Sequence, residues 1–157
     1  MRNYAWIALM AVALDQVSKW GARRLTAPLT LIPGVVQLRY TENTGMAFSL
    51  FSGRPWLLVI LSLALVTLGA LALHRYQLGT LSKTAAMMML GGAVGNLIDR
   101  VFLGYVVDMV EVLFVSFAIF NVADMFLTIG CILMAASLLW RPQEWSERDG
   151  HSRGNPA

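Results

Sequence analysis

Charged residues and cysteines are both scarce in this chain. Asp, Glu, Lys and Arg make up 13% of its 157 residues, against about 25% in ordinary soluble domains, while 57% of the residues are hydrophobic. Cys131 is the single cysteine, so an internal disulfide is excluded, and its apolar surroundings are typical of a small hydrophobe. This composition predicts an integral membrane protein with one domain.

Sequence patterns for metal or nucleic-acid binding are missing as well. There is no CxxC or HExxH, and the two histidines, His74 and His151, lie apart near charged segments. The net charge of +3 is low for a nucleic-acid binder. Lys and Arg lie mainly at the ends of apolar segments, where they anchor helices at a membrane interface. We therefore expect no metal, no cofactor and no nucleic-acid partner.

Four apolar segments predict a mostly α membrane protein with four transmembrane helices. The spans are expected at about residues 4–20, 56–73, 84–103 and 113–140, within a single domain over residues 1–142. The first segment could also be a signal peptide with a cleavage site at Ala11-Val12-Ala13, but apolar sequence continues past that site. Residues 143–157 are polar, and we expect a disordered tail there.

An even number of spans places both termini on one side of the membrane. Lys and Arg are divided equally between the two ends of the predicted spans, so the positive-inside rule does not say which side that is.

A small β element is predicted between the first and second spans, at about residues 28–50. Residues 35–41 have the β-branched and aromatic content of a strand. Pro28, Pro33 and Gly34 break helices, and Asn43-Thr44-Gly45 is turn chemistry. The element is too short to fold alone, so we expect it to pack on the helices at the membrane surface.

Polar side chains are concentrated in residues 91–124, which are otherwise nearly all apolar. A charge at the membrane midplane costs about 2.5–3.5 kcal/mol, so such groups persist where they pair, line a wet cavity or do chemistry. The glycines of this segment predict close helix packing. Asp15 and Lys19, four residues apart on the first span, predict an ion pair. The concentrated polar residues are Asn96, Asp99, Arg100, Asp108, Asn121 and Asp124.

Asp108 and Asp124 are the candidate reacting pair. Asp108 lies in the short link before the fourth span, and Asp124 lies within that span without a nearby cation in the sequence. Two close carboxylates share one proton, so that one acts as base on a water while the other polarises a carbonyl, as in aspartic peptidases. Two alternatives stay open. One is a proton-coupled transporter that uses Asp99 and Asp124, although no internal repeat supports it, and the other is a non-catalytic scaffold.

Five motifs in order make the chain resemble bacterial lipoprotein signal peptidases, the type II signal peptidases, over about residues 4–140. Met46 departs from the family pattern, in which a smaller residue is common. The motifs are Asp15-Gln16-Val17-Ser18-Lys19, Asn43-Thr44-Gly45-Met46-Ala47-Phe48, Gly91-Gly92-Ala93-Val94-Gly95-Asn96-Leu97-Ile98-Asp99-Arg100, Val107-Asp108 and Phe120-Asn121-Val122-Ala123-Asp124.

The resemblance implies an intramembrane aspartic endopeptidase of the bacterial inner membrane. Such enzymes cut prolipoproteins on the N-terminal side of a diacylglyceryl-modified cysteine. It implies cytoplasmic termini, a periplasmic β-cradle, an active site near the periplasmic leaflet and inhibition by globomycin-type peptides. We expect a monomer surrounded by membrane lipids, with residues 35–48 and 104–112 as clamps around the substrate.

The resemblance also implies a role for each matching residue. Asp108 and Asp124 match the catalytic pair, and Asp15 with Lys19 matches a structural polar pair. The positions that bind substrate or support the site are Asn43, Gly45, Asn96, Asp99, Arg100, Asn121 and Ala123.

Overall fold

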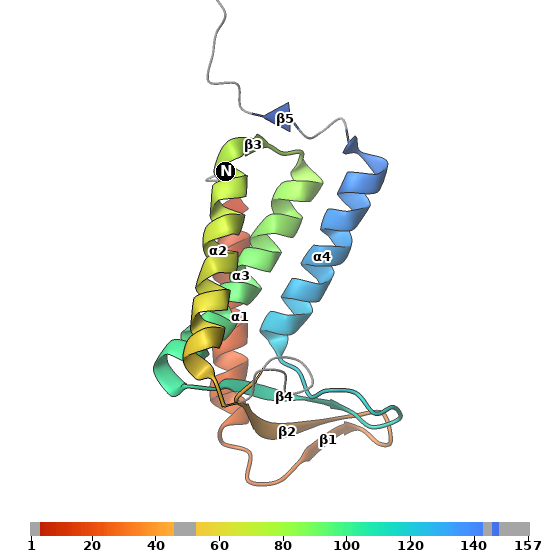
Figure 1. The fold of residues 1–157 in the computed structure, drawn as a ribbon. Helices are drawn as coiled ribbons and strands as arrows, with labels where there is room; N and C mark the ends of the chain where they lie inside the picture. The colour runs from red at the N-terminus through yellow and green to blue at the C-terminus, as the bar shows by residue number, and fades with distance from the viewer. Residues whose placement is uncertain (1–3, 46–52, 143–145, 148–157) are drawn as a thin grey trace, which may run out of the picture.

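The computed structural model describes residues 4–45, 53–142 and 146–147. Within these residues four helices run side by side, and a small antiparallel sheet lies across one end of them (Figure 1). Met46, the rest of its motif to Phe48 and most of the predicted tail lie outside the described residues. The helices are α1 (Ala5–Ala22), α2 (Pro55–Arg75), α3 (Thr80–Leu103) and α4 (Val122–Trp140).

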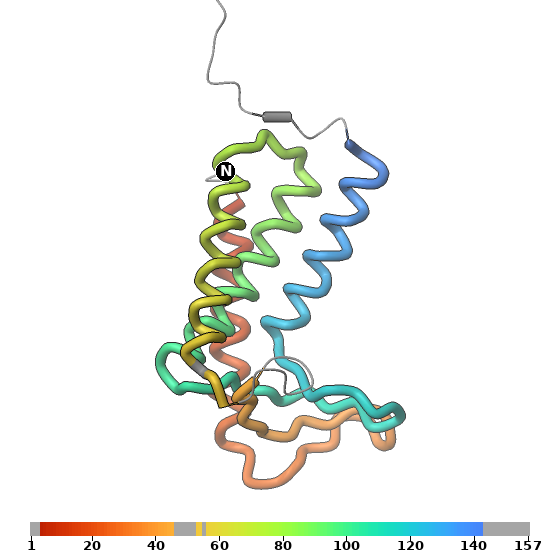
Figure 2. The backbone as a smooth tube through the Cα atoms, in the orientation of Figure 1, coloured from red at the N-terminus to blue at the C-terminus, as the bar shows by residue number. Residues whose placement is uncertain are grey.

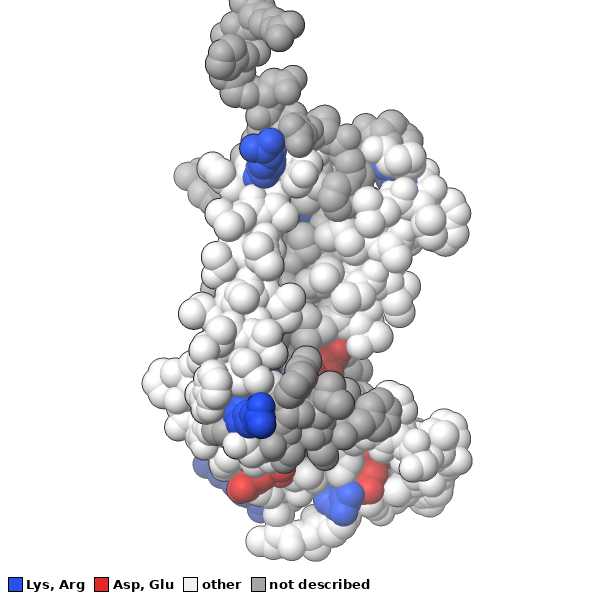
Figure 3. All heavy atoms as spheres, viewed as in Figure 1, with Lys and Arg blue, Asp and Glu red and all other residues white. Residues whose placement is uncertain are grey.

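Three of these helices are long and apolar enough to cross a membrane. They are Trp56–Arg75, Thr80–Leu103 and Val122–Trp140. The first predicted span corresponds to α1, which is not among the three, so a count of four spans stays a prediction. On the face shown in Figure 3, charged side chains gather at the two ends of the molecule and the helices between them present uncharged surface. Many large apolar side chains are exposed, as lipid-facing helices require.

The start of α1 and the end of α4 lie at the same end of the bundle, opposite the sheet (Figure 2). At that end a two-residue strand, β3 (Tyr76–Gln77), pairs with β5 (Ser146–Glu147). Residues 143–157 are the tail expected to be disordered, and the structure describes two of them, Ser146 and Glu147, which form β5.

The predicted β element is present, and its strands belong to a sheet of three. The order is β1 (Leu29–Ile32), β2 (Val36–Asn43) and β4 (Val106–Val112), all antiparallel. A bulge between Leu38 and Thr41 sets the register, with Thr41 opposite Asp108 and Asn43 opposite Val106. Opposed residues share a face of a sheet, so Asn43 and Asp108 lie diagonally on one face. The segment 104–112 is therefore mostly a strand, although the sequence alone predicts a short link there.

The predicted start of the fourth span, at residue 113, is wrong. Helix α4 begins at Val122, and its N-cap is Asn121. The preceding apolar residues form a loop that returns along β4, where Val110 and Phe120 form an isolated bridge. Phe114 and Phe117 of this loop are largely exposed. Apolar content alone does not distinguish a membrane helix from such a segment, and the capping side chain of Asn121 decides where the helix starts.

Helix α3 is the centre of the bundle because its glycines let α1 and α4 approach it closely. An added Cβ would lie 2.7 Å from Ala11 Cβ on α1 at Gly91, and 2.5 Å from the Ala123 carbonyl oxygen on α4 at Gly92. At Gly95 it would lie 2.6 Å from Asp15 Oδ2. The packing role predicted for these glycines is confirmed.

Candidate active site

Asp108 and Asp124 come from different elements and line one cavity of about 570 Å³. Asp108 lies in the middle of β4, and Asp124 lies in the first turn of α4. We call this space the active-site cavity. Its polar lining also includes Asn43, Asn96 and Arg100, and its apolar wall is formed by Val106, Phe117, Ala118, Ile119, Phe120, Met125, Leu127 and Ile129, with Thr128 beside them.

Asp108 is buried, with 3% of its surface exposed, and it is held by two amides. Asn43 Nδ2 donates to its Oδ2 at 2.9 Å, and Asn121 Nδ2 donates to its Oδ1 at 2.7 Å. Burial raises the pKa of Asp108 from its ordinary 3.8 to about 6; the nearby Asp124 charge adds to the rise, and the two amides oppose it. A carboxyl group tuned in this way exchanges protons near neutral pH.

Asp124 is part of the cap of its own helix. Asn121 Oδ1 accepts a hydrogen bond from the Asp124 backbone N–H at 2.9 Å, and Asp124 Oδ2 accepts one from the Asn121 backbone N–H at 3.2 Å. This reciprocal pair is a capping box. The other carboxylate oxygen, Oδ1, accepts from Asn96 Nδ2 at 2.8 Å. Asp124 therefore has a fixed position and a carboxylate that faces the cavity.

Asn121 connects the two carboxylates. Its Nδ2 donates to Asp108, and its backbone N–H donates to Asp124. The same Nδ2 also donates to Asn96 Oδ1 at 3.1 Å. One buried residue thus fixes β4, α3 and α4 relative to each other and holds both candidate reacting groups.

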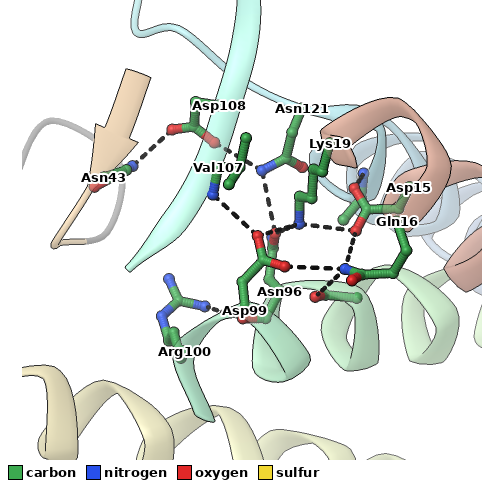
Figure 4. A network of polar contacts seen from close by, with 12 residues as sticks. Asp15, Gln16, Lys19, Asn43, Asn96, Asp99, Arg100, Val107, Asp108 and Asn121 are labelled. Atoms are coloured by element: carbon green, nitrogen blue, oxygen red, sulfur yellow. Dashed lines mark hydrogen bonds and ion pairs between the residues drawn. The ribbon is translucent and has the colours of Figure 1, made fainter. Parts of the chain in front are cut away.

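Behind this pair lies a buried charge network around Lys19 (Figure 4). The Lys19 ammonium contacts Asp15 Oδ2 at 2.8 Å and Asp99 Oδ2 at 3.0 Å, and all three side chains are at most 1% exposed. Asp15 Oδ1 accepts from the Ala123 backbone N–H, and Asp99 Oδ2 accepts from the Val107 backbone N–H. The network therefore ties α1 and α3 to the residues that precede both candidate catalytic groups. The ion pair predicted between Asp15 and Lys19 is confirmed.

Arg100 reaches the turn that follows β2. Its NH2 group donates to the Gly45 carbonyl oxygen at 3.3 Å, and its NH1 group has long contacts of 3.5 Å with Ser62 Oγ and the Asn96 carbonyl oxygen. Asn43 Oδ1 closes the same turn by accepting from the Gly45 backbone N–H at 2.9 Å. The Arg100 Nε–H is buried and lacks a hydrogen-bond partner among the described residues.

The structure brings every sequence-predicted site residue into one region at the sheet end of the helices. Five of them, Asn43, Asn96, Arg100, Asp108 and Asp124, line the cavity. The others hold these residues in place, and Ala123 does so through its backbone N–H. Sequence reasoning gave no role to Gln16, whose Nε2 donates to Asp15, Asp99 and the Gly95 carbonyl oxygen. Its place between Asp15 and Lys19 in the first motif was the available signal. Among the described residues, no group of three or more His, Cys, Asp or Glu side chains could hold a metal ion.

Comparisons with known proteins agree over nearly the whole chain. Residues 7–140 match the family model described as signal peptidase (SPase) II. A lipoprotein signal peptidase of Streptococcus pyogenes serotype M3 is 39% identical over 149 residues, which cover 92% of this chain and 97% of that protein. Two solved structures, each described as a bacterial membrane enzyme, have TM-scores of 0.82 and 0.76. They are 25% and 28% identical, and the matches cover 99% and 90% of this chain and 96% and 95% of theirs.

Proposed function

The chain belongs to the signal peptidase II family, and from this premise we propose that Asp108 and Asp124 are the catalytic pair with which it cleaves prolipoprotein signal peptides. It is an aspartic protease and a multi-pass membrane protein. The transporter alternative finds no support in these relatives. The observation that carries the residue assignment is that both carboxylates line one cavity and both accept hydrogen bonds from Asn121.

The two carboxyl groups divide the work of peptide hydrolysis between them. One, ionised, takes a proton from a water as the water oxygen attacks the scissile carbonyl carbon. The other, protonated, donates to the carbonyl oxygen, which gives a neutral tetrahedral diol. The diol then collapses: the peptide C–N bond breaks, the leaving nitrogen takes up one proton, and a hydroxyl proton returns to the pair. The cycle ends with one shared proton on the two carboxyl groups, as it began.

The apolar wall of the active-site cavity suits a lipid-modified substrate. Phe117, Ile119 and Ile129 lie within the same cavity as the two carboxylates, and Phe117 and Ile129 are also substantially exposed at the surface. We propose that this side admits the diacylglyceryl-modified cysteine of a prolipoprotein and that the cut falls on its N-terminal side. Bound substrate would cover the two carboxyl groups and exclude bulk water, which would strengthen their electrostatic interactions with the reacting groups. Globomycin-type peptides are proposed to occupy the same cavity.

The proposed cellular setting is the bacterial inner membrane. We place the sheet and the catalytic pair on the periplasmic side and the chain termini in the cytoplasm. Supporting this, the start of α1 and the end of α4 lie at the end of the bundle opposite the sheet (Figure 2). We propose a monomer as the working unit, since one chain supplies both carboxylates and the residues that hold them.

Cleavage of a diacylglyceryl-modified prolipoprotein by purified protein tests the catalytic pair. Asp108→Asn and Asp124→Asn are each expected to lower kcat/KM by at least about 10²-fold, because a positioned acid or base contributes that much or more. Glu111→Gln is the matched control. Glu111 is on β4 as well, but it bonds Gln37 and Arg39 and does not line the cavity, so cleavage should persist. Normal cleavage by a folded double variant, Asp108→Asn with Asp124→Asn, would refute the assignment of these two residues as the catalytic pair.

A further inference from the structure

Lys19 is fully buried, yet the hydrolysis described above does not use it. We propose that Lys19 is a positioning residue that acts through Asn96, because its ammonium fixes the Asn96 amide with the NH2 end toward Asp124. The inference rests on the proposed catalytic role of Asp124. It goes beyond the structural ion pair that the sequence predicts for Lys19 and Asp15.

The hydrogen bonds of Lys19 are complete. An ammonium group has three protons and no acceptor. Lys19 Nζ lies 2.8 Å from Asp15 Oδ2, 3.0 Å from Asp99 Oδ2 and 2.9 Å from Asn96 Oδ1. Two protons therefore neutralise carboxylates, and the third is directed at the amide that contacts Asp124. A purely structural ion pair would need the first two alone.

The contacts of Asn96 allow one orientation of its amide. Oδ1 accepts from Lys19 and from Asn121 Nδ2, while Nδ2 donates to Asp124 Oδ1. Turning the amide over would place its NH2 group against two donors and its oxygen against a carboxylate. Lys19 is the charged member of the two donors, and the Asn121 amide is shared with Asp108. The ammonium also polarises the amide, which strengthens the bond that the NH2 end donates.

The charges that face this unit come from several elements. Asp15 on α1 and Asp99 on α3 contact the ammonium directly. Asp108 on β4 and Arg100 on α3 both interact electrostatically with Asp124. Helix α2 contributes the neutral Ser62 hydroxyl, which contacts Arg100. Lys19 is therefore one of two described cations near the catalytic pair, and it is the one bonded to the amide that contacts Asp124.

Loss of the Lys19 hydrogen bond should change the chemistry more than the binding of substrate. With Lys19→Met the Asn96 amide loses its charged donor, so it stabilises the ionised carboxylate less well. The acidic limb of the kcat/KM profile should then move to higher pH by up to about one unit, because the hydrogen bond from Asn96 to the carboxylate is weakened and not lost. At neutral pH kcat should fall while KM stays within about twofold, because Lys19 does not line the cavity.

The single variant leaves Asp15 and Asp99 buried without their cation, so it can fail to fold. A charge-conserving double variant, Lys19→Met with Asp15→Asn, removes one charge of each sign and keeps an oxygen for the Ala123 N–H. We expect it to fold and to show the same shift of the acidic limb. If it folds and its pH profile and kcat match the wild type, Lys19 is structural and the proposal is overturned. Failure of this double variant to fold would also overturn it, since Lys19 would then act on the fold.

Two further variants show whether the effect passes through Asn96. Gln16→Met is the matched control, because Gln16 contacts Asp15 and Asp99, and we expect an unmoved acidic limb. In an Asn96→Ala background, addition of the charge-conserving pair should move the limb no further. An additional full shift in that background would mean that Lys19 acts through space and would refute the route proposed here.

These results are distinguishable from a failure of the proposed function. If Asp124→Asn cleaves normally, the catalytic assignment fails before Lys19 is considered. If Asp124→Asn is inactive and the charge-conserving variant retains the wild-type profile, the positioning role alone fails.

Discussion

Gly92 offers a sharp test of how closely α3 and α4 must approach for activity. An alanine Cβ at this position would lie 2.5 Å from the Ala123 carbonyl oxygen and 2.9 Å from Leu127 Cγ. The first of these atoms is backbone, so it cannot rotate away. To restore an ordinary contact of 3.4 Å, the two helices must separate locally by about 0.9 Å.

This separation of α3 and α4 would occur next to the hydrogen bond between Asn96 and Asp124. Asn96 lies one turn beyond Gly92, and its Nδ2 donates to Asp124 Oδ1 at 2.8 Å. A separation of about 0.9 Å would break that bond, and functional groups must stay within about 0.5 Å of their working geometry. We expect Gly92→Ala to lower kcat/KM by roughly 10²-fold. Overpacking should also cost about 1–3 kcal/mol of unfolding free energy, partly offset by about 1 kcal/mol from the better helix former.

The measurement combines cleavage of a lipidated prolipoprotein with thermal unfolding in the same detergent. Gly69→Ala on α2 is the matched control, because no described atom lies within 4 Å of its added Cβ. We expect wild-type cleavage and unchanged or slightly higher stability there. If folded Gly92→Ala cleaves as fast as Gly69→Ala, the site tolerates the displacement and the argument from close helix approach is refuted.

Two further predictions concern Asp108 and Asn121. The pKa of Asp108 is raised by burial from 3.8 to about 6, so its contribution to stability is fully present below about pH 3.8 and is lost as the pH rises through about 6. Wild-type stability should therefore fall over this range relative to that of Asp108→Asn, by at most about 3 kcal/mol, and parallel melting curves against pH would contradict the burial argument. Asn121→Ala should lose about 2–4 kcal/mol of unfolding free energy, because the cap of α4 and the donor to Asp108 both disappear. An Asn121→Ala protein as stable as the wild type would show that neither bond matters to the fold.

The helices and the second strand, β2, could be predicted because their signals are local, whereas β1 was covered only by the general expectation of a β element at about residues 28–50. Apolar segments mark α2 and α3, and β-branched residues between helix breakers mark β2. The link that proved to be β4 also carries a local signal. Val106–Val112 reads VVDMVEV, in which the acids Asp108 and Glu111 sit among β-branched residues. Its strand character was hidden by the expectation that neighbouring membrane helices are joined by a short turn.

The start of α4 illustrates two signals in conflict. An apolar run from residue 113 favours an early start, while Asn121 followed three residues later by an acid is the sequence form of a helix N-terminus. The structure follows the second signal because four free N–H groups at a helix start need partners. An unpaired N–H costs more than an apolar residue left in a loop at a membrane surface.

The hydrogen bonds and ion pairs that connect the site residues cannot be predicted from local sequence patterns. The spacing of Asp15 and Lys19 predicts their ion pair, but the contacts of Lys19 with Asn96 and Asp99 join residues far apart in the chain. Amide polarity adds a second obstacle, since the sequence does not show which end of Asn96 faces Asp124. The contacts of Lys19 and the orientation of the Asn96 amide both depend on how α1 and α4 pack against the glycines of α3. That packing is a property of the whole bundle.

The capping box of α4 includes Asp124, so a proton moved by the proposed catalytic pair would also change the start of the helix. Whenever Asp124 holds a proton, it is a weaker acceptor for the Asn121 N–H and carries no charge to favour the positive end of the helix. Protonation of Asp124, which the proposed mechanism includes, therefore weakens the cap of α4. The same reasoning makes Asp124→Asn a cleaner inactive variant than Asp124→Ala, because the Asn oxygen can still close the cap.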